Sequence, residues 1–589
     1  MCGIAGIVGR DLADVDPASC EAMLATLRRR GPDDRGTLAF PHCILLHTRL
    51  SILDLATGGQ PMRDARRNVA ITFNGEIYNF QEVKRELAAR GHEFATRSDT
   101  EVILKAYLEY GSDCPQHLDG MFAFGIWDEE RQTLLLARDR FGKKPLYWAH
   151  DAAGNLLFAS EIKTLLASGR IAGQLDYGAV DAYLRLTYVP PARTVYRDVH
   201  VVRPAETLTL AGGALRRRSY WSLERRPLHL GRDEARERLR ALLDDAVRKR
   251  MVADVEIGAL LSGGVDSTIV TDYAQRSTTR PIKTFSVGYG DYINELPYSQ
   301  AAAERIGTDH TTLQVGGAEL ADDLQAVAAY FDEPHADSSN VSQFLVSRLA
   351  RTRVKVALCG DGGDEVFLGY PWYWHHRTQG RAFRLRQALL SSPFRDYVQG
   401  LQLFGPQQRR ALWGGEPPDD AELLEPALRG RFGGVERINR FDLTVYLPGQ
   451  LLVKADRAGM MNSLEVRSPL LDHRLAEFAF NLPLEYKTDG ANGKLLLKQL
   501  LAELLPAEFV HRKKQGFGAP VRDWLKTICR PLVHDLLAAS DARVHGFLER
   551  GGVAPMIERF YTTDDASDYG RIWVLLCLEL WLRAPRAVA

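Results

Sequence analysis

A glycine-rich turn between an apolar strand and a helix constrains the fold of this chain more than any other feature. Residues 256–261 indicate a buried strand, 262–267 have the sequence SGGVDS, and 268–276 indicate a helix. Further buried strands are expected at 283–287 and 354–358, with helices between them. Such alternation is typical of a doubly wound parallel sheet.

The residues before this region have many strand patterns and few helices. Residues 69–78 predict a hairpin that turns at Asn74-Gly75, since Asn-Gly is a strong signal for a tight turn. The sequence SDTE at 98–101 predicts a capping box that opens a helix. The other elements expected here are a helix at 82–90 and strands at 121–128 and 133–138.

Two domains follow from these patterns. We expect a first domain of stacked sheet and helix layers over residues 2–205, an irregular linker over 206–232 and a second domain over 233–589. The second domain should begin with a long helix at 233–250 and become mostly helical after about residue 375. Residues 573–582, which Glu579 interrupts, indicate a buried helix.

Composition excludes several classes of protein. The 589 residues include 75 Lys and Arg against 75 Asp and Glu, so no net charge favours binding to nucleic acid or an anionic membrane. No apolar stretch approaches the length of a membrane span, and no secretory signal is evident. The seven cysteines form no CxxC pair, which favours reduced thiols and a cytoplasmic protein.

Cys2 directly follows the initiator methionine. Its small side chain would permit removal of Met1, which leaves Cys2 with a free α-amine. Such an amine titrates near pH 8, so it can accept the thiol proton close to neutral pH. One residue would then be both nucleophile and base, although a cysteine at position 2 on its own is more often a coincidence.

Several motifs follow Cys2 in a fixed order, and together they resemble the class II glutamine amidotransferase domain. The resemblance covers residues 2–205 and implies an N-terminal-nucleophile fold, an αββα sandwich. The motifs are CGIAG at 2–6, RGPD at 30–33, RLSI at 49–52, GQPM at 59–62, FNGEIYN at 73–79 and SDTE at 98–101.

The resemblance implies a role for each residue of this site. Cys2 would attack the glutamine side-chain amide, and Asn74 with the Gly75 N–H would form the oxyanion hole. Arg49 would bind the α-carboxylate and Asp99 the α-amine of glutamine, in a pocket that Ile52 and Glu76 also line. Taken singly, Asn74-Gly75 is typical of a turn, Asp99 of a first-turn helix acid and Arg49 of a solvated surface residue.

The SGGVDS turn resembles the pyrophosphate loop of the N-type ATP pyrophosphatases. A second acidic loop, CGDGGDE at 359–365, follows another strand and suits the crevice at the end of a parallel sheet. It lacks a full calcium-binding pattern. The resemblance implies ATP with Mg²⁺ on Asp266 and Asp364, and nucleotide contacts from Leu261, Ser262, Gly263, Gly264, Asp266, Ser267, Val287, Gly288, Cys359 and Gly360.

Nearly the whole chain is similar to the asparagine synthetase B family. The additional motifs are DEPHADSS at 332–339, LVKADR at 452–457, SLEVRSPLLD at 463–472 and RKKQGFG at 512–518. The resemblance implies that Lys514 stabilises charge at the acyl phosphate. Asp361 stands where the best-known asparagine synthetases have glutamate, so a carboxylate that could position ammonia is one methylene shorter.

The expected function is therefore a glutamine-dependent amidotransferase. It would hydrolyse glutamine, channel ammonia internally and use ATP to adenylate L-aspartate, giving asparagine, AMP and pyrophosphate. Two alternatives stay open: another carboxylate acceptor in a polysaccharide or natural-product pathway, and a non-catalytic binding protein of the same fold. The expected partners are glutamine, ATP and the acceptor, and the resemblance suggests a homodimer.

Overall fold

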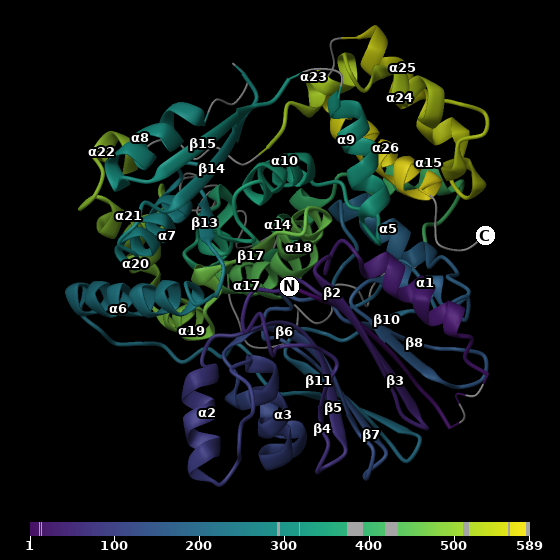
Figure 1. The fold of residues 1–589 in the computed structure, drawn as a ribbon. Coiled ribbons are helices and arrows are strands. Elements are labelled where there is room, and N and C mark those ends of the chain that lie inside the picture. Colours follow the sequence, from purple (N-terminus) through teal and green to yellow (C-terminus); the bar gives the residue numbers. More distant parts are fainter. Residues whose placement is uncertain are drawn as a thin grey trace.

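The computed structural model describes residues 1–10, 12, 14–290, 295–316, 319–373, 393–418, 434–510, 518–563 and 566–584. An N-terminal part built on two antiparallel sheets packs against a C-terminal part built on a parallel sheet and many helices (Figure 1). Within the described residues, no helix is both long enough and apolar enough to cross a membrane. All seven cysteines are buried and free.

The first antiparallel sheet holds the N-terminus at its centre. Its strand order is β10-β8-β9-β1-β3-β2, so β1 lies between β9 and β3 and Cys2 immediately precedes this central strand. The strands are β1 (Gly3–Val8), β2 (Asp34–Ala39), β3 (Cys43–Arg49), β8 (Tyr147–His150), β9 (Leu156–Ala159) and β10 (His200–Val201).

The second antiparallel sheet stacks face to face on the first. Its order is β12-β11-β7-β6-β5-β4, and β5 packs on β1 and β3 of the first sheet. The strands are β4 (Met62–Asp64), β5 (Val69–Ile77), β6 (Gly120–Asp128), β7 (Thr133–Arg138), β11 (Glu206–Ala211) and β12 (Ala214–Ser219).

Helices cover both outer faces of the two stacked sheets. α1 (Pro17–Leu27) packs on β1 and β3, and α3 (Asp99–Tyr110) packs on β5 together with its neighbour α2 (Phe80–Ala89) (Figure 1). The layers are therefore helix, sheet, sheet and helix, which confirms the expected αββα sandwich. Shorter helices complete this part: the 3-10 helix Gly111–His117, α4 (Ile162–Ala167) and α5 (Tyr177–Leu186).

The predicted hairpin at Asn74-Gly75 is wrong. β5 continues through both residues and pairs with β6 along its whole length. Gly75 has a φ of +151°, and a Cβ there would lie 2.0 Å from the Met121 carbonyl oxygen. The glycine therefore permits close strand approach instead of forming a turn, because pairing across the sheet overrides the local turn preference.

Two other local predictions need correction. Residues 208–219 are not irregular, because β11 and β12 form a hairpin that extends the second sheet. The domain boundary after residue 205 stays a prediction. α3 begins as expected, with the Ser98 hydroxyl accepting from Thr100 N at 3.1 Å, but the capping box does not close. Glu101 instead accepts from the backbone N–H groups of Ala95 and Thr96.

The C-terminal part contains the expected parallel sheet. Its order is β15-β14-β13-β16-β17 and every pair is parallel. Sequence reasoning missed both edge strands, β15 and β17. The strands are β13 (Ile257–Leu260), β14 (Lys283–Gly288), β15 (Asp309–Gln314), β16 (Val356–Leu358) and β17 (Glu465–Arg467).

Helices flank this sheet and form most of the remaining chain. α6, α7 and α21 pack together, whereas α10 packs on β13, β14 and α18. The earlier helices are α6 (Arg232–Arg250), α7 (Val265–Arg276), α8 (Leu296–Ile306), α9 (Glu319–Tyr330), α10 (Ser339–Arg351) and α11 (Gly363–Val366). The later ones are α14 (Pro393–Leu401), α15 (Pro406–Trp413), α17 (Gly434–Phe441), α18 (Leu452–Met461), α19 (His473–Asn481), α20 (Leu484–Lys487), α21 (Leu495–Leu501), α22 (Ala507–Val510), α23 (Val521–Lys526), α24 (Arg530–Leu532), α25 (Arg550–Thr562) and α26 (Tyr569–Arg583).

The predicted buried helix near the C-terminus is α26. Its Glu579 is fully buried and accepts from the backbone N–H groups of Arg543 and Val544. Arg583, one turn along the helix, also pairs with this carboxylate at 2.5 Å. These three partners satisfy the charge that interrupts the apolar run.

Candidate active sites

Cys2 lies in a buried position between the two antiparallel sheets. Its backbone N–H donates to Asn74 Oδ1 at 3.0 Å. Burial raises the pKa of the Cys2 thiol, although the charge of the chain terminus, the Leu50 N–H and Arg49 lower it in part. The thiol therefore needs a base to become a nucleophile, which is the task expected of its own α-amine.

The Asn74 side chain presents a spare donor beside Cys2. Asn74 is fully buried, and its Nδ2 has no hydrogen-bond partner among the described residues. An unused buried amide donor costs free energy unless a ligand uses it. Because Oδ1 of the same amide already binds Cys2, Nδ2 is held close to the nucleophile, as an oxyanion-hole donor should be.

Met1 fills the space next to Cys2. Its α-ammonium lies 2.8 Å from Glu465 Oε2 of the C-terminal part, and both groups are fully buried. Its side chain packs with Leu50, Ile52 and Met460. Removal of Met1 would therefore both free the Cys2 α-amine and open a space beside it.

The two acids predicted to bind glutamine, Glu76 and Asp99, both lie near Glu465 and Arg467 of the C-terminal part. Glu76 Oε1 lies 3.2 Å from Arg467 Nη2, and Asp99 Oδ2 accepts from Ile77 N at 3.0 Å. Burial raises the pKa of Asp99 to about 6 and the pKa of Glu76 well above its usual range, with Arg467 opposing the shift at Glu76. Buried carboxylates of this kind suit a cationic ligand such as an α-ammonium group.

Arg49 is held by the loop that follows it. Its guanidinium donates to the carbonyl oxygens of Leu53, Asp54 and Leu55, the shortest contact being 2.7 Å to Asp54. The alternative of a solvated surface arginine is excluded, since Arg49 is 7% exposed. The backbone carbonyls fix the orientation of the guanidinium beside the Cys2 site.

A cavity of about 930 Å³ lies at the carboxyl ends of the parallel strands. This is a suitable volume and position for a nucleotide with a second substrate. The glycine loop at 262–267, the acidic loop at 359–365 and the end of β14 contribute to its walls. Of the residues predicted for ATP, metal or ammonia, the cavity is lined by Leu261, Ser262, Gly264, Asp266, Ser267, Val287, Cys359, Gly360, Asp361 and Asp364.

The glycine loop between β13 and α7 is tied together by its two serines. Ser262 Oγ lies 3.0 Å from Ser267 Oγ and accepts from Gly264 N at 3.3 Å. α7 begins at Val265, earlier than the expected residue 268, so Asp266 and Ser267 lie in its first turn. The N-terminal turn of α7 therefore lines the cavity, as a phosphate site requires.

Gly263 and Gly288 do not line the cavity. A Cβ on Gly263 would lie 2.5 Å from the Tyr298 carbonyl carbon, and one on Gly288 would lie 2.6 Å from Leu296 Cγ. Both neighbours belong to α8. The two glycines therefore let this helix approach the glycine loop and β14 closely.

Lys494 joins the two predicted metal ligands. Its Nζ lies 2.5 Å from Asp266 and 2.6 Å from Asp364. Burial would lower the pKa of Lys494, but the two carboxylates raise it above its ordinary range, so the side chain stays an ammonium. Two carboxylates brought to one point are hard oxygen donors of the kind Mg²⁺ prefers, and the residues present fit that ion.

The acidic loop presses against the first turn of α7. A Cβ on Gly363 would lie 2.4 Å from Asp266 Cγ. Cys359 Sγ lies 3.1 Å from Asp361 Oδ2, and burial raises the pKa of this thiol well above its ordinary value. Cys359 therefore stays protonated, which agrees with a small buried residue that is not a nucleophile.

Sequence reasoning gave no role to three lysines that line this cavity, Lys454, Lys494 and Lys498. Lys454 lies 2.8 Å from Ser339 Oγ and 3.3 Å from Asp337 Oδ2. Although burial acts against it, Lys454 lowers the pKa of Asp337 to about 2. Lys494 has a φ of +60°, so its backbone lies in the left-handed region, which costs strain and orients the side chain. In the sequence, only the preceding Asn-Gly pair indicates such a conformation. The predicted Lys514 lies outside the described residues.

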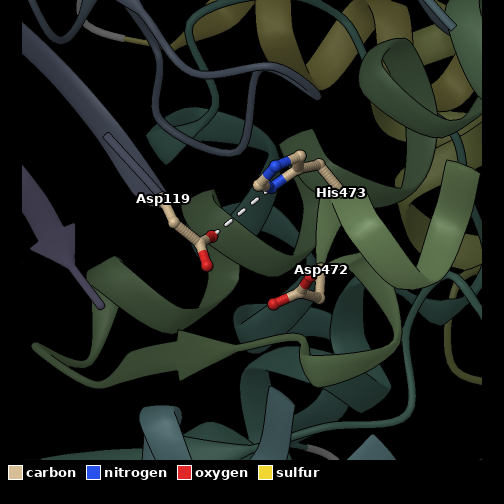
Figure 2. A group of neighbouring side chains, drawn as sticks. All are labelled: Asp119, Asp472 and His473. Carbon is tan, nitrogen blue, oxygen red and sulfur yellow. Dashed lines mark ion pairs between the residues drawn. The ribbon is translucent and has the colours of Figure 1, made fainter. Parts of the chain in front are cut away.

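A third group of titratable residues lies outside both sites. Asp119 of the N-terminal part approaches Asp472 and His473 of the C-terminal part, with 3.5 Å between His473 Nδ1 and Asp119 Oδ1 (Figure 2). Arg250 and Arg474 pair with Asp472 at 3.2 and 2.8 Å. These cations already balance the carboxylates, so the group is an ionic contact between the two parts of the chain.

Comparison with known proteins assigns a family to each part of the chain. Residues 1–221 match the family model described as a glutamine amidotransferase domain, and residues 238–583 match that of asparagine synthase. A putative glutamine-hydrolyzing asparagine synthetase of Mycobacterium tuberculosis is 34% identical, over 99% of this chain and 97% of its own. Asparagine synthetase 1 of Bacillus subtilis is 29% identical, over 99% and 96%.

A more distant relative has a different name. The amidase chyE of Penicillium rubens is 27% identical, over 92% of this chain and 91% of its own. The two family models together cover most of the chain, one matching the part that begins with Cys2 and the other the part that holds the parallel sheet. The chain is therefore a glutamine-dependent amidotransferase of the asparagine synthase family.

Proposed function

We propose that this enzyme transfers the amide nitrogen of glutamine to the side-chain carboxylate of L-aspartate, with ATP converted to AMP and pyrophosphate. The proposal depends on one observation above all. Asp266, Lys494 and Asp364 meet at a helix N-terminus in a cavity large enough for ATP and an acceptor. The Cys2 site in the same chain would supply the nitrogen.

At the first site, Cys2 would attack the side-chain amide of glutamine. The α-amine takes the thiol proton, the thiolate bonds to the amide carbon, and the oxyanion accepts a hydrogen bond from Asn74 Nδ2. Ammonia leaves with the proton, and water then releases glutamate from the thioester. Arg49, Glu76 and Asp99 would bind the α-carboxylate and α-ammonium of glutamine.

At the second site, the acceptor carboxylate would attack the α-phosphorus of ATP. The N–H groups at the start of α7 and the Lys494 ammonium are placed to stabilise the departing pyrophosphate. Asp266 and Asp364 would hold Mg²⁺, which neutralises charge on the phosphates when it is bound. Ammonia then displaces AMP from the acyl carbon, and Asp361 is a candidate to accept its surplus proton.

The test is pyrophosphate release with ammonium as nitrogen donor, with and without L-aspartate, and product identification by mass. Stimulation by L-aspartate with asparagine formed supports the proposal. No stimulation, in an enzyme that still hydrolyses glutamine, would refute L-aspartate as the acceptor. Cys2→Ala should lose glutamine-dependent synthesis and keep ammonium-dependent synthesis.

A second candidate keeps the chemistry and changes the acceptor to another carboxylate. Asp361 favours this candidate, because its side chain is one methylene shorter than glutamate. It would therefore place its carboxylate differently in the cavity. An aromatic wall lines the same cavity, where the Tyr370 and Trp372 rings stack with centroids 4.1 Å apart. Activity with several larger acids and poor activity with L-aspartate would select this candidate.

A further inference from the structure

Strand β17 belongs to the parallel sheet, yet its side chains form part of the Cys2 site. Glu465 Oε2 contacts the Met1 α-ammonium at 2.8 Å, and Arg467 Nη2 lies 3.2 Å from Glu76 Oε1. The Glu465 and Arg467 side chains are fully buried. The edge strand of the synthetase part is therefore a wall of the glutaminase site.

The Arg467 guanidinium is fixed in one orientation. Nη1 donates to the carbonyl oxygens of Arg250 and Val252 at 2.7 and 2.9 Å, and Nε donates to Glu465 Oε1 at 2.7 Å. A buried charge with this many partners has little freedom to move. Nη2 is consequently held toward Glu76.

The backbone of the same residue anchors the acidic loop of the ATP cavity. The Arg467 carbonyl accepts from Cys359 N at 2.9 Å, at the start of the loop. Ser468 Oγ lies 3.2 Å from Cys359 Sγ, and that sulfur contacts Asp361 at 3.1 Å. Arg467 thus touches a predicted glutamine ligand with its side chain and the ATP cavity with its backbone.

We infer that Arg467 is a positioning residue shared by the two active sites. Its guanidinium holds Glu76 for the α-ammonium of glutamine, and its carbonyl links that position to the loop that carries Asp361. The inference rests on the proposed function and adds a coupling to it: ATP and acceptor in the cavity change the affinity for glutamine. Linkage requires the reverse effect to be equal.

The charges around Glu76 explain why an arginine is needed there. The titratable and charged groups that act on it are Arg467, Glu465, Asp99, Tyr78 and the Met1 α-ammonium. Arg467 lowers the pKa of all three buried carboxylates, whereas Lys144 is a further cation that acts on Glu465. Replacing Arg467 by a neutral side chain would drive protonation of Glu76 and weaken the binding of a cationic α-ammonium.

The experiment compares Arg467→Met with Arg474→Met, using glutamate release at varied glutamine with and without MgATP and L-aspartate. Arg474 is a matched control, because it also joins the two parts of the chain, at Asp119, but touches neither site. For Arg467→Met we expect the KM for glutamine to rise at least about tenfold, with kcat changed less than about threefold. Arg467→Lys should recover part of the loss.

The coupling is read from the same data. In the wild type, MgATP with L-aspartate should change the KM for glutamine by about fivefold or more, and Arg467→Met should abolish that change while Arg474→Met keeps it. Two results would overturn the inference. One is a KM for glutamine in Arg467→Met equal to that of the wild type. The other is a wild-type enzyme that forms product but whose KM for glutamine does not respond to MgATP with L-aspartate. Failure of the proposed function gives a different result, namely a wild type that releases no pyrophosphate.

Discussion

Replacing Asn74 by Ala isolates the chemistry of the first site. The change removes the buried Nδ2 donor and the Oδ1 that accepts from Cys2 N at 3.0 Å. Loss of one oxyanion-hole donor costs about 10²–10³ in kcat, or about 3–4 kcal/mol. Loss of the neutral hydrogen bond that holds Cys2 adds about 1 kcal/mol. We therefore expect kcat for glutamine hydrolysis to fall by about 10³ or more.

Two assays on the same preparation test this reasoning. Glutamate release at saturating glutamine measures the first site, and pyrophosphate release with ammonium measures the second. Ammonium-dependent synthesis should be unchanged, because Asn74 does not line the ATP cavity. A fall of less than about tenfold in glutamine hydrolysis would refute the oxyanion role. Equal loss of both activities would indicate a structural defect instead.

Four further outcomes follow from the structure. The active enzyme should lack Met1 by mass spectrometry, and a chain that retains it should lose glutamine hydrolysis alone. Lys494→Met should lower pyrophosphate release with either nitrogen donor by about 10² or more and leave glutamine hydrolysis intact. Burial raises the pKa of Asp99 to about 6, so this carboxylate gains a proton as pH falls through 6. The KM for glutamine should therefore rise between pH 7 and pH 5, and a KM that does not change with pH would contradict this. Asp472→Asn, which leaves the buried Arg250 without its carboxylate, should lower the free energy of unfolding in urea by about 3–5 kcal/mol, whereas a loss under about 1 kcal/mol would contradict the pairing.

Predictions from sequence succeeded where the chemistry is local. The glycine loop at 262–267 and the acidic loop at 359–365 each follow a buried strand, and both line the cavity as expected. Cys2 could be singled out because its position at the chain terminus is itself the chemical signal. Each loop is a run of neighbouring residues, and in Cys2 the nucleophile and its expected base belong to one residue, so a short pattern carries the information.

The failures arise where distant segments decide the structure. Asn74-Gly75 has a strong local turn preference, but pairing with β6 holds it in a strand. β17 has three residues, too few to show a period, and only its pairing with β16 defines it as a strand. Lys494 owes its place to Asp266 and Asp364, which lie far away in the sequence. No local rule points to such contacts.

Transfer of nitrogen between the two sites is the central claim, and isotope labelling tests it most directly. The enzyme is supplied with glutamine labelled with ¹⁵N in its side-chain amide, excess unlabelled ammonium, ATP and L-aspartate, and the product amide is analysed by mass. We expect predominantly ¹⁵N amide in the wild type and only ¹⁴N amide in Cys2→Ala. Product from the wild type that carries only ¹⁴N would contradict direct transfer between the two sites.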